Sequence, residues 1–286
     1  MADRKKSGTR VNLDQYDEDM KKEILRQLKK RERRRKFLCF LCIVAAIGCI
    51  GYFGAYYYLA DKSDGQFEEL AELKSKKPVS EGIKVHKTGA VEVPDILDEY
   101  KNLYNKNKSL IGWLKIDDTI IDYPVMQSPD SEYYLTHNFN QEQDKNGSIF
   151  MDPACDVLKP STNLILYGHH MKSGKMFGDL ARYEDETYMK EHAVIKFDTL
   201  YEKGTYQVMY VFRSKLYQDS EITFKYYQFI DANSAQEFDS NMRAMAEMSY
   251  YDTGVTATYG DRLLTLSTCD NQEQDGRFVV VAKKIR

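Results

Sequence analysis

The stretch LLTLSTCDNQEQDGRFVVVA, residues 263–282, contains two apolar runs separated by a polar segment. Each run has the length and composition of a buried β-strand, so the stretch predicts two strands joined by a loop. The first strand ends near Cys269 and the second begins at Arg277. If these strands pair as neighbours, the thiol and the guanidinium lie at the same edge of a sheet. A fixed guanidinium favours the thiolate and can hold a developing oxyanion, whereas the simpler alternative is a buried cysteine beside a surface arginine.

A histidine pair follows another apolar run. Residues 163–167 read NLILY and are followed by Gly168, His169 and His170. Imidazole is the side chain best suited to move protons near neutral pH, so a histidine at a strand end favours a catalytic interpretation of the cysteine and the arginine. The alternation of side chains along the strand does not decide which histidine points toward the site.

Other kinds of site have weaker support. A zinc site would use Cys155, Cys269, His169 and His170, but these residues lack the CxxC and HxxxH spacings of such sites. The serine-hydrolase motif GxSxG and the phosphate-binding glycine motifs do not occur. We therefore expect neither a metal nor a cofactor. In an oxidising compartment Cys155 and Cys269 could pair, although one bridge would not form a disulfide framework.

Short apolar and β-branched runs recur along the C-terminal two thirds of the chain. Many short strands separated by turn signals predict a mostly-β sandwich or barrel. A helix is expected after Pro94, where Ile96, Tyr100 and Leu103 share one face, and another after Ser234. The expected strands cover residues 111–116, 119–125, 148–151, 163–167, 193–197, 205–217, 262–268 and 277–283. The late helix presents Phe238, Met242 and Met245 as an apolar stripe, and its methionines are expected to pack in the core.

The N-terminal part of the chain has a different composition. Residues 37–60 form an uncharged apolar stretch long enough to cross a bilayer, and residues 29–36 are strongly basic. Positive charge stays on the cytoplasmic side, and Tyr56, Tyr57 and Tyr58 suit the far interface. The sequence therefore predicts a cytoplasmic tail (1–36), a transmembrane anchor (37–60), a stalk or linker (61–90) and an extracellular catalytic domain (91–286). Beyond the tail, no basic face interleaved with aromatics supports a nucleic-acid partner.

The sequence resembles the sortases, and among them class B. The family signature TLxTC followed by an arginine stands here as TLSTC (265–269) with Arg277. Further segments resemble class B in the same order: IGWL (111–114), IDYPV (121–125), YYL (133–135), GSIF (147–150), YGH (167–169) and MFGDL (176–180). The resemblance implies an eight-stranded sortase β-barrel with an N-terminal helical region and a helix before the cysteine strand. By the family pattern, the catalytic histidine is His169.

The resemblance also implies an activity. Cys269, His169 and Arg277 would catalyse transpeptidation, with Ser267, Thr268 and Tyr167 as substrate contacts. The substrate would be a secreted protein with an NPQTN-like or LPXTG-like sorting signal. The enzyme would cleave it after threonine and join it to an amine of peptidoglycan or of its lipid-linked precursor. A hydrolytic cysteine peptidase and a non-enzymatic surface adhesion module are the alternatives.

Overall fold

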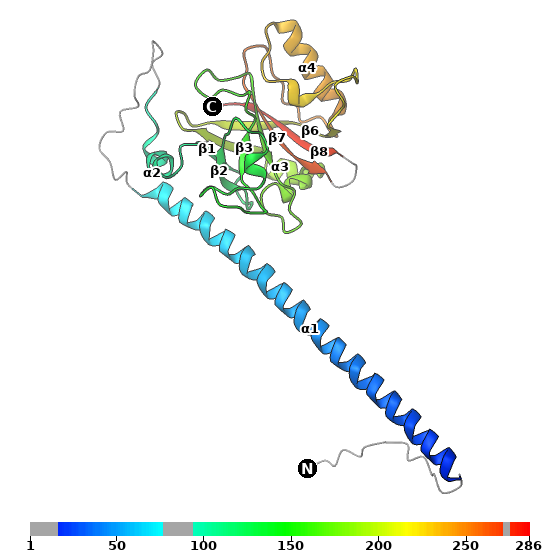
Figure 1. Cartoon of the computed structure of the whole chain (residues 1–286). Coiled ribbons are helices and arrows are strands. Elements are labelled where there is room, and N and C mark those ends of the chain that lie inside the picture. The colour runs from blue at the N-terminus through cyan, green and yellow to red at the C-terminus, as the bar shows by residue number, and fades with distance from the viewer. Residues whose placement is uncertain (1–16, 77–93, 271–274) are drawn as a thin grey trace. The chain divides into compact units, whose positions relative to one another are not determined.

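The chain consists of two compact units, Met1–Gln66 and Phe67–Arg286. The computed structural model describes residues 17–76, 94–270 and 275–286, with the side chains of residues 55–64 and 270 left out. Helix α1 (Glu18–Ser75) begins in the first unit and ends in the second (Figure 1). Residues 77–90 of the predicted stalk, and the side chains of the three tyrosines expected at the interface, lie outside the described residues.

The first unit contains the apolar part of α1. Within Glu18–Gly54, the most apolar window has a mean hydropathy of 2.3 and 0% of it is buried. Among the described residues this is one helix long and apolar enough to cross a membrane. Side chains such as Phe37, Phe40 and Ile47 are exposed, as a lipid-facing helix requires. These features are consistent with a membrane anchor.

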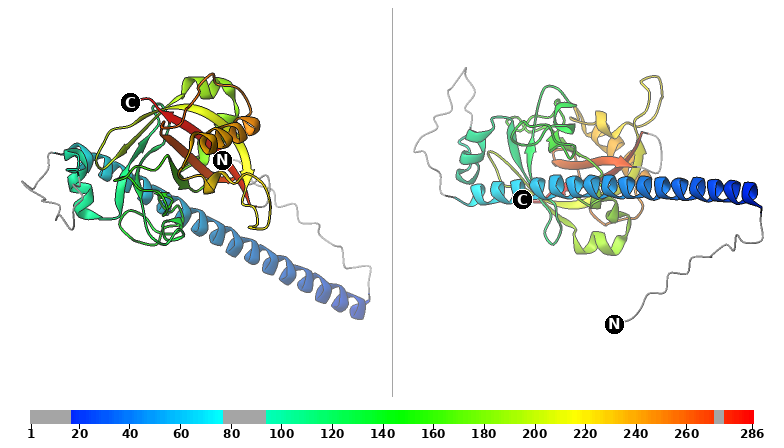
Figure 2. Two further views of the ribbon diagram at one scale, coloured as in Figure 1. Left: turned by 90° about the horizontal axis from the view of Figure 1, so that it is seen from above. Right: turned by 60° about the horizontal axis from the view of Figure 1, so that its bottom comes forward.

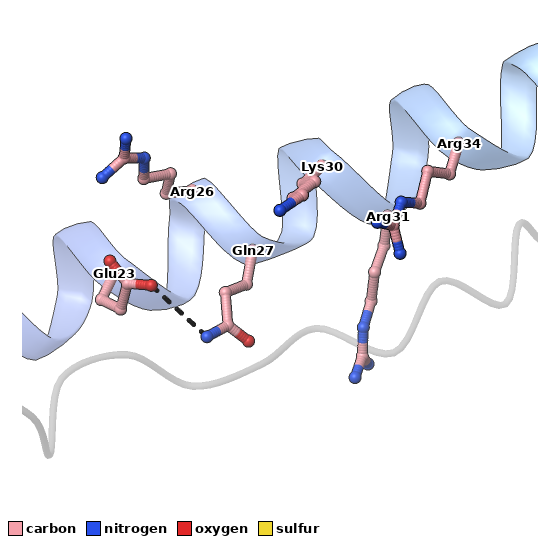
Figure 3. Close-up of a pocket in the computed structure, with 6 residues that line it drawn as sticks. All are labelled: Glu23, Arg26, Gln27, Lys30, Arg31 and Arg34. Atoms are coloured by element: carbon pink, nitrogen blue, oxygen red, sulfur yellow. Dashed lines mark hydrogen bonds between the residues drawn. The ribbon is translucent and has the colours of Figure 1, made fainter.

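Basic side chains precede this apolar segment on the same helix. Figure 3 shows Arg26, Lys30, Arg31 and Arg34 extending from α1, beside a Gln27 that donates to Glu23 at 3.4 Å. A cluster of cations next to a membrane-length apolar segment is typical of the cytoplasmic end of an anchor.

Eight strands of the second unit close into a barrel with the order β1-β2-β3-β4-β7-β8-β6-β5 (Figures 1 and 2). Two pairings are parallel, β2 with β3 and β4 with β7, and the other six are antiparallel. Each expected strand is present with its ends shifted by a few residues, so the barrel prediction is confirmed. The strands are β1 (Leu110–Lys115), β2 (Asp122–Met126), β3 (Ile149–Met151), β4 (Asn163–Gly168), β5 (Val194–Thr199), β6 (Thr205–Lys215), β7 (Leu263–Asp270) and β8 (Gly276–Lys284).

The two helices expected in this domain are α2 (Asp98–Lys106) and α4 (Ala235–Met248). Ser234 caps α4 by accepting the N–H of Glu237 at 3.2 Å. The Glu237 carboxylate accepts the N–H of Asn233 at 2.9 Å, one residue before the cap, so the reciprocal bond of a capping box is shifted. The domain also contains four short helical segments that the sequence did not predict, because they are too short to give a periodic signal. They are α3 (Glu186–Glu191) and the 3₁₀ segments η1 (Tyr133–Leu135), η2 (Gly178–Glu184) and η3 (Tyr226–Gln228).

Apolar side chains fill the barrel and the spaces beneath its helices. Val211, Leu266 and Val280, from three different strands, are fully buried in the main cluster. On the outer side, α4 packs Phe238 and Met245 in a second cluster with residues of β6 and β8. The methionines of α4 are therefore core residues, as expected.

The boundary between linker and domain differs from the prediction. Residues 61–90 were expected to form a stalk, but the compact unit begins at Phe67. Leu70 on the last turns of α1 is only 2% exposed, and Phe67 and Leu73 pack against the same cluster. The reason is hydrophobic: these three side chains form an apolar face that α2 and the nearby strands bury.

Replacing Leu70 by alanine is expected to destabilise the second unit by about 2 to 4 kcal/mol, because it leaves a cavity in a fully packed cluster. Thermal unfolding of the full chain in detergent micelles measures the effect. Glu68→Ala on the exposed side of the same helix is the matched control and is expected to change stability little. Equal stability of the two variants would contradict the assignment of this segment to the core.

Candidate active site

The ends of three neighbouring strands form the candidate site. β4 and β7 are parallel with Gly168 paired to Thr268, so both strands end at the same edge of the barrel. The next residues along the two strands are His169 and Cys269. β8 runs antiparallel to β7 and places Arg277 directly opposite Cys269. Opposite residues of an antiparallel pair lie about 4.5–5.5 Å apart at Cα, so the topology brings these three residue types together.

A cleft of about 290 Å³ opens at this edge of the barrel. All six residues singled out in the sequence line it: Tyr167, His169, Ser267, Thr268, Cys269 and Arg277. The remaining walls come from η1 and the loop before it, from β3 and the residue after it, from the end of β4, from the segment after β6 and from η3. These further lining residues are Ser131, Glu132, Leu135, Phe150, Asp152, Gly168, Leu216 and Tyr227.

The imidazole of His169 has a defined partner. Its Nε2 lies 2.7 Å from the carbonyl oxygen of Leu135. A carbonyl oxygen only accepts, so this contact requires a hydrogen on Nε2 and leaves Nδ1 for proton exchange. Gly168 allows this placement because a Cβ there would lie 2.5 Å from Ile149 Cδ1 and 2.8 Å from Phe177 Cδ2.

The thiol of Cys269 is exposed at the cleft, opposite the partly exposed Arg277. Arg277 Nη1 donates to the carbonyl oxygens of Gly276 at 2.9 Å and Asp275 at 3.3 Å. A guanidinium carries five N–H donors, so these two bonds hold its plane and leave donors for a ligand in the cleft.

The side chains next to the cysteine are tied into the protein. Ser267 and Thr268 are 1% and 2% exposed. The Ser267 hydroxyl shares a 2.7 Å hydrogen bond with the Tyr226 hydroxyl, and Thr268 donates to the carbonyl of Gly168 at 2.8 Å. Burial raises the pKa of Tyr226 to about 12, so this phenol is neutral. The Thr268 bond connects the ends of β4 and β7 and therefore supports the spacing of His169 and Cys269.

Tyr167 presents its ring to the cleft and anchors its hydroxyl. The hydroxyl donates to Asp152 Oδ2 at 3.0 Å, and burial together with the neighbouring carboxylate raises the pKa of this tyrosine. The ring contacts that of Phe150 at a centroid separation of 5.6 Å. Together they form an aromatic wall of fixed orientation.

Two residues considered from the sequence lie away from the cleft. His170 pairs with Met176 in a β-bridge, and its Nδ1 is buried without a hydrogen-bond partner among the described residues. Cys155 is a free cysteine, 4% exposed, between Asn163 O and Ile165 N at 3.5 and 3.4 Å. Burial raises the pKa of its thiol to about 12, so it packs as a protonated group.

Sequence reasoning missed the carboxylates of the cleft and the tyrosine beneath it. Glu132 and Asp152 belong to turns and loops and Tyr227 to the short segment η3, where no periodic pattern marks a side chain as facing a site. Tyr226 begins a short 3₁₀ segment that has no pattern of its own. The sequence indicated this part of the cleft only through the segments YYL (133–135) and GSIF (147–150), which resemble class B sortases and contribute Leu135 and Phe150 to the lining.

Comparison with known proteins agrees with the geometry. The Sortase domain family model matches residues 114–285. Sortase B of Listeria monocytogenes is 33% identical over 193 residues, covering 67% of this chain and 76% of the relative. The crystal structure of sortase B from Bacillus anthracis in complex with AAEK1 has a TM-score of 0.67 at 33% identity, covering 80% of this chain and 99% of that one. The Staphylococcus aureus sortase B–substrate complex has a TM-score of 0.61 at 31% identity, covering 67% and 87%.

The strands form a closed eight-stranded barrel, and one cleft at its edge is lined by a cysteine, a histidine and an arginine. Together with the match to the family model, these features define a cysteine transpeptidase. The chain belongs to the sortase family. Its relatives and structural neighbours place it in class B.

Proposed function

We propose that Cys269 is the nucleophile of this class B sortase, that His169 moves the protons and that Arg277 stabilises the oxyanion. The observation that carries the proposal is that all three side chains line one cleft, at the adjoining ends of β4, β7 and β8. In the first step the Cys269 thiolate attacks the carbonyl carbon of the substrate threonine. The C–S bond forms as the negative charge moves to the carbonyl oxygen, where Arg277 donates hydrogen bonds.

His169 supplies the proton that lets the amide nitrogen leave. With Nε2 bonded to Leu135 O, the proton passes from Nδ1 of the imidazolium to the leaving amine as the C–N bond breaks. An amine then attacks the thioester carbonyl, His169 takes a proton from it, and the Cys269 thiolate leaves. The covalent intermediate divides one difficult amide exchange into two easier steps.

The cleft supports a short extended peptide as the acyl donor. Its aromatic wall of Tyr167 and Phe150 offers apolar contact, and Ser267 and Thr268 contribute the floor beside the nucleophile. We propose an NPQTN-like or LPXTG-like sorting signal on a secreted protein as the substrate. The acceptor is then an amine of peptidoglycan or of its lipid-linked precursor.

For the arrangement in the cell, residues 1–36 are assigned to the cytoplasm and residues 37–60 to the membrane. The basic side chains before the apolar segment support this orientation, because positive charge is retained on the cytoplasmic side (Figure 3). The barrel then lies outside the cell, where the wall amine is available. Residues 77–90 remain assigned to a linker.

The proposal is tested with the full chain in detergent micelles, incubated with peptides of both signal types and excess triglycine amide. Mass spectrometry is expected to show peptide cleaved after threonine and joined to the amine. His169→Ala is expected to lower the rate by about 10²- to 10⁴-fold, as loss of a general acid–base group does. Free acid as the main product with amine in excess would support the hydrolytic peptidase instead. Unchanged turnover of His169→Ala would refute the role of this histidine.

A further inference from the structure

Glu132 is a carboxylate residue that lines the cleft. The segment to which it belongs also accepts a hydrogen bond from His169. Glu132 is exposed and directly precedes η1. The last residue of η1 is Leu135, whose carbonyl accepts from His169 Nε2 at 2.7 Å. Glu132 therefore belongs to the wall of the cleft that carries the histidine contact.

The other carboxylate of the cleft is already engaged. Asp152 accepts from the Tyr167 hydroxyl at 3.0 Å and from the N–H of Ala154 at 2.9 Å. Within the described part of the chain, the backbone N–H of Glu132 donates to Asp130 Oδ1 at 2.9 Å, and its carboxylate has no hydrogen-bond or ion-pair partner. Its charge is thus available to a ligand that enters the cleft.

Only one reactant of the transfer is cationic where it reacts. The acyl donor offers a neutral peptide bond, whereas an α-amine with a pKa near 7.7–8.0 arrives largely as ammonium at neutral pH. The same amine must reach His169 before it can attack the thioester. A carboxylate on the wall that contacts His169 attracts the ammonium, whereas the guanidinium of Arg277 repels it.

We propose that Glu132 is a specificity-determining residue that binds the protonated acceptor amine beside His169. This inference rests on the proposed function. The bound ammonium loses one proton to solvent, the neutral amine attacks the thioester carbonyl, and its second proton passes to His169. The C–N bond forms as the C–S bond breaks, and the Cys269 thiolate and the His169 imidazolium are restored.

The test compares two nucleophiles that differ in charge, using the full chain in micelles. Triglycine amide carries a cationic amine and no carboxylate, whereas hydroxylamine is uncharged at neutral pH. For Glu132→Gln, the triglycine amide concentration that gives half-maximal transfer is expected to rise about two- to fivefold, the size expected of a partly exposed ion pair. Glu132→Lys is expected to raise it further, and high salt is expected to reduce the difference.

Glu247→Gln is the matched control, because Glu247 is an exposed carboxylate on α4, outside the residues that line the cleft. It is expected to leave both nucleophiles unaffected. Each transfer rate is normalised to the rate of peptide cleavage without amine. The half-maximal concentration is then expected to rise in the Glu132 variants for triglycine amide and not for hydroxylamine. An equal change for hydroxylamine, or no change for either nucleophile, overturns the inference. A wild-type chain that cleaves neither signal peptide overturns the proposed function, and the inference with it.

Discussion

Replacing Cys269 by alanine is expected to lower transpeptidation by at least about 10³-fold, because no thioester can form without the nucleophile. The wild-type chain should also accumulate a covalent adduct with a sorting-signal peptide when the amine is withheld, and the variant should not. Mass spectrometry of the intact chain measures the adduct, and chromatography of the peptide products measures the rate. A Cys269→Ala variant that keeps wild-type turnover would contradict the assignment.

Cys155→Ser is the matched control for this experiment. Cys155 is buried, and serine can keep both of its polar contacts, so transfer is expected to continue. The raised pKa of about 12 also predicts that Cys155 resists iodoacetamide at pH 7 to 8 while the exposed Cys269 reacts. Labelling of Cys155 should require unfolding, since its thiol is then exposed and its pKa returns to the ordinary range.

Replacing Arg277 by alanine is expected to lower the maximal rate by about 10²- to 10³-fold, the usual effect of removing an oxyanion donor. The reduction should fall on the maximal rate more than on the peptide concentration for half-maximal rate, because the oxyanion exists only during the reaction. Arg277→Lys is expected to restore only part of the rate. Its ammonium keeps the positive charge, but it is flexible and cannot reproduce a guanidinium plane held by the carbonyl groups of Asp275 and Gly276.

Arg243→Ala provides the control for general loss of positive charge. Arg243 is an exposed residue of α4 and donates to a carbonyl of its own helix. Its replacement is expected to leave the rate unchanged. If Arg277→Ala altered only the peptide concentration dependence, Arg277 would be a binding residue and not an oxyanion donor.

The sequence predicted the barrel well because its strands have strong local signals. The runs around Leu266 and Val280 are apolar and β-branched over most of their length, as buried strands require. The helix α4 was equally clear, with a cap at Ser234 and an apolar stripe. The resemblance to the sortases then selected His169 from a histidine pair that strand alternation had left undecided.

The parts that were missed depend on contacts distant in the chain. The sequence places Phe67, Leu70 and Leu73 on one possible helix face, but it does not show which surface of the barrel domain covers that face. Glu132 and Asp152 enter the cleft through turns whose path depends on partners far along the chain. The hydrogen bonds of the Ser267 and Thr268 hydroxyls could not be predicted either, because their partners Tyr226 and Gly168 lie 41 and 100 residues away in the sequence.

The parallel pairing of β4 with β7 has a consequence for biogenesis. The bond between Thr268 and Gly168 closes a separation of 100 residues, and such non-local contacts form slowly because the chain must first lose the entropy of a long loop. The proposed nucleophile lies on β7 and the proposed oxyanion donor on β8, the last strand among the described residues. In a partly folded chain Cys269 therefore lies apart from His169 and Arg277, and the proposed catalytic group forms only when β7 docks beside β4 and β8.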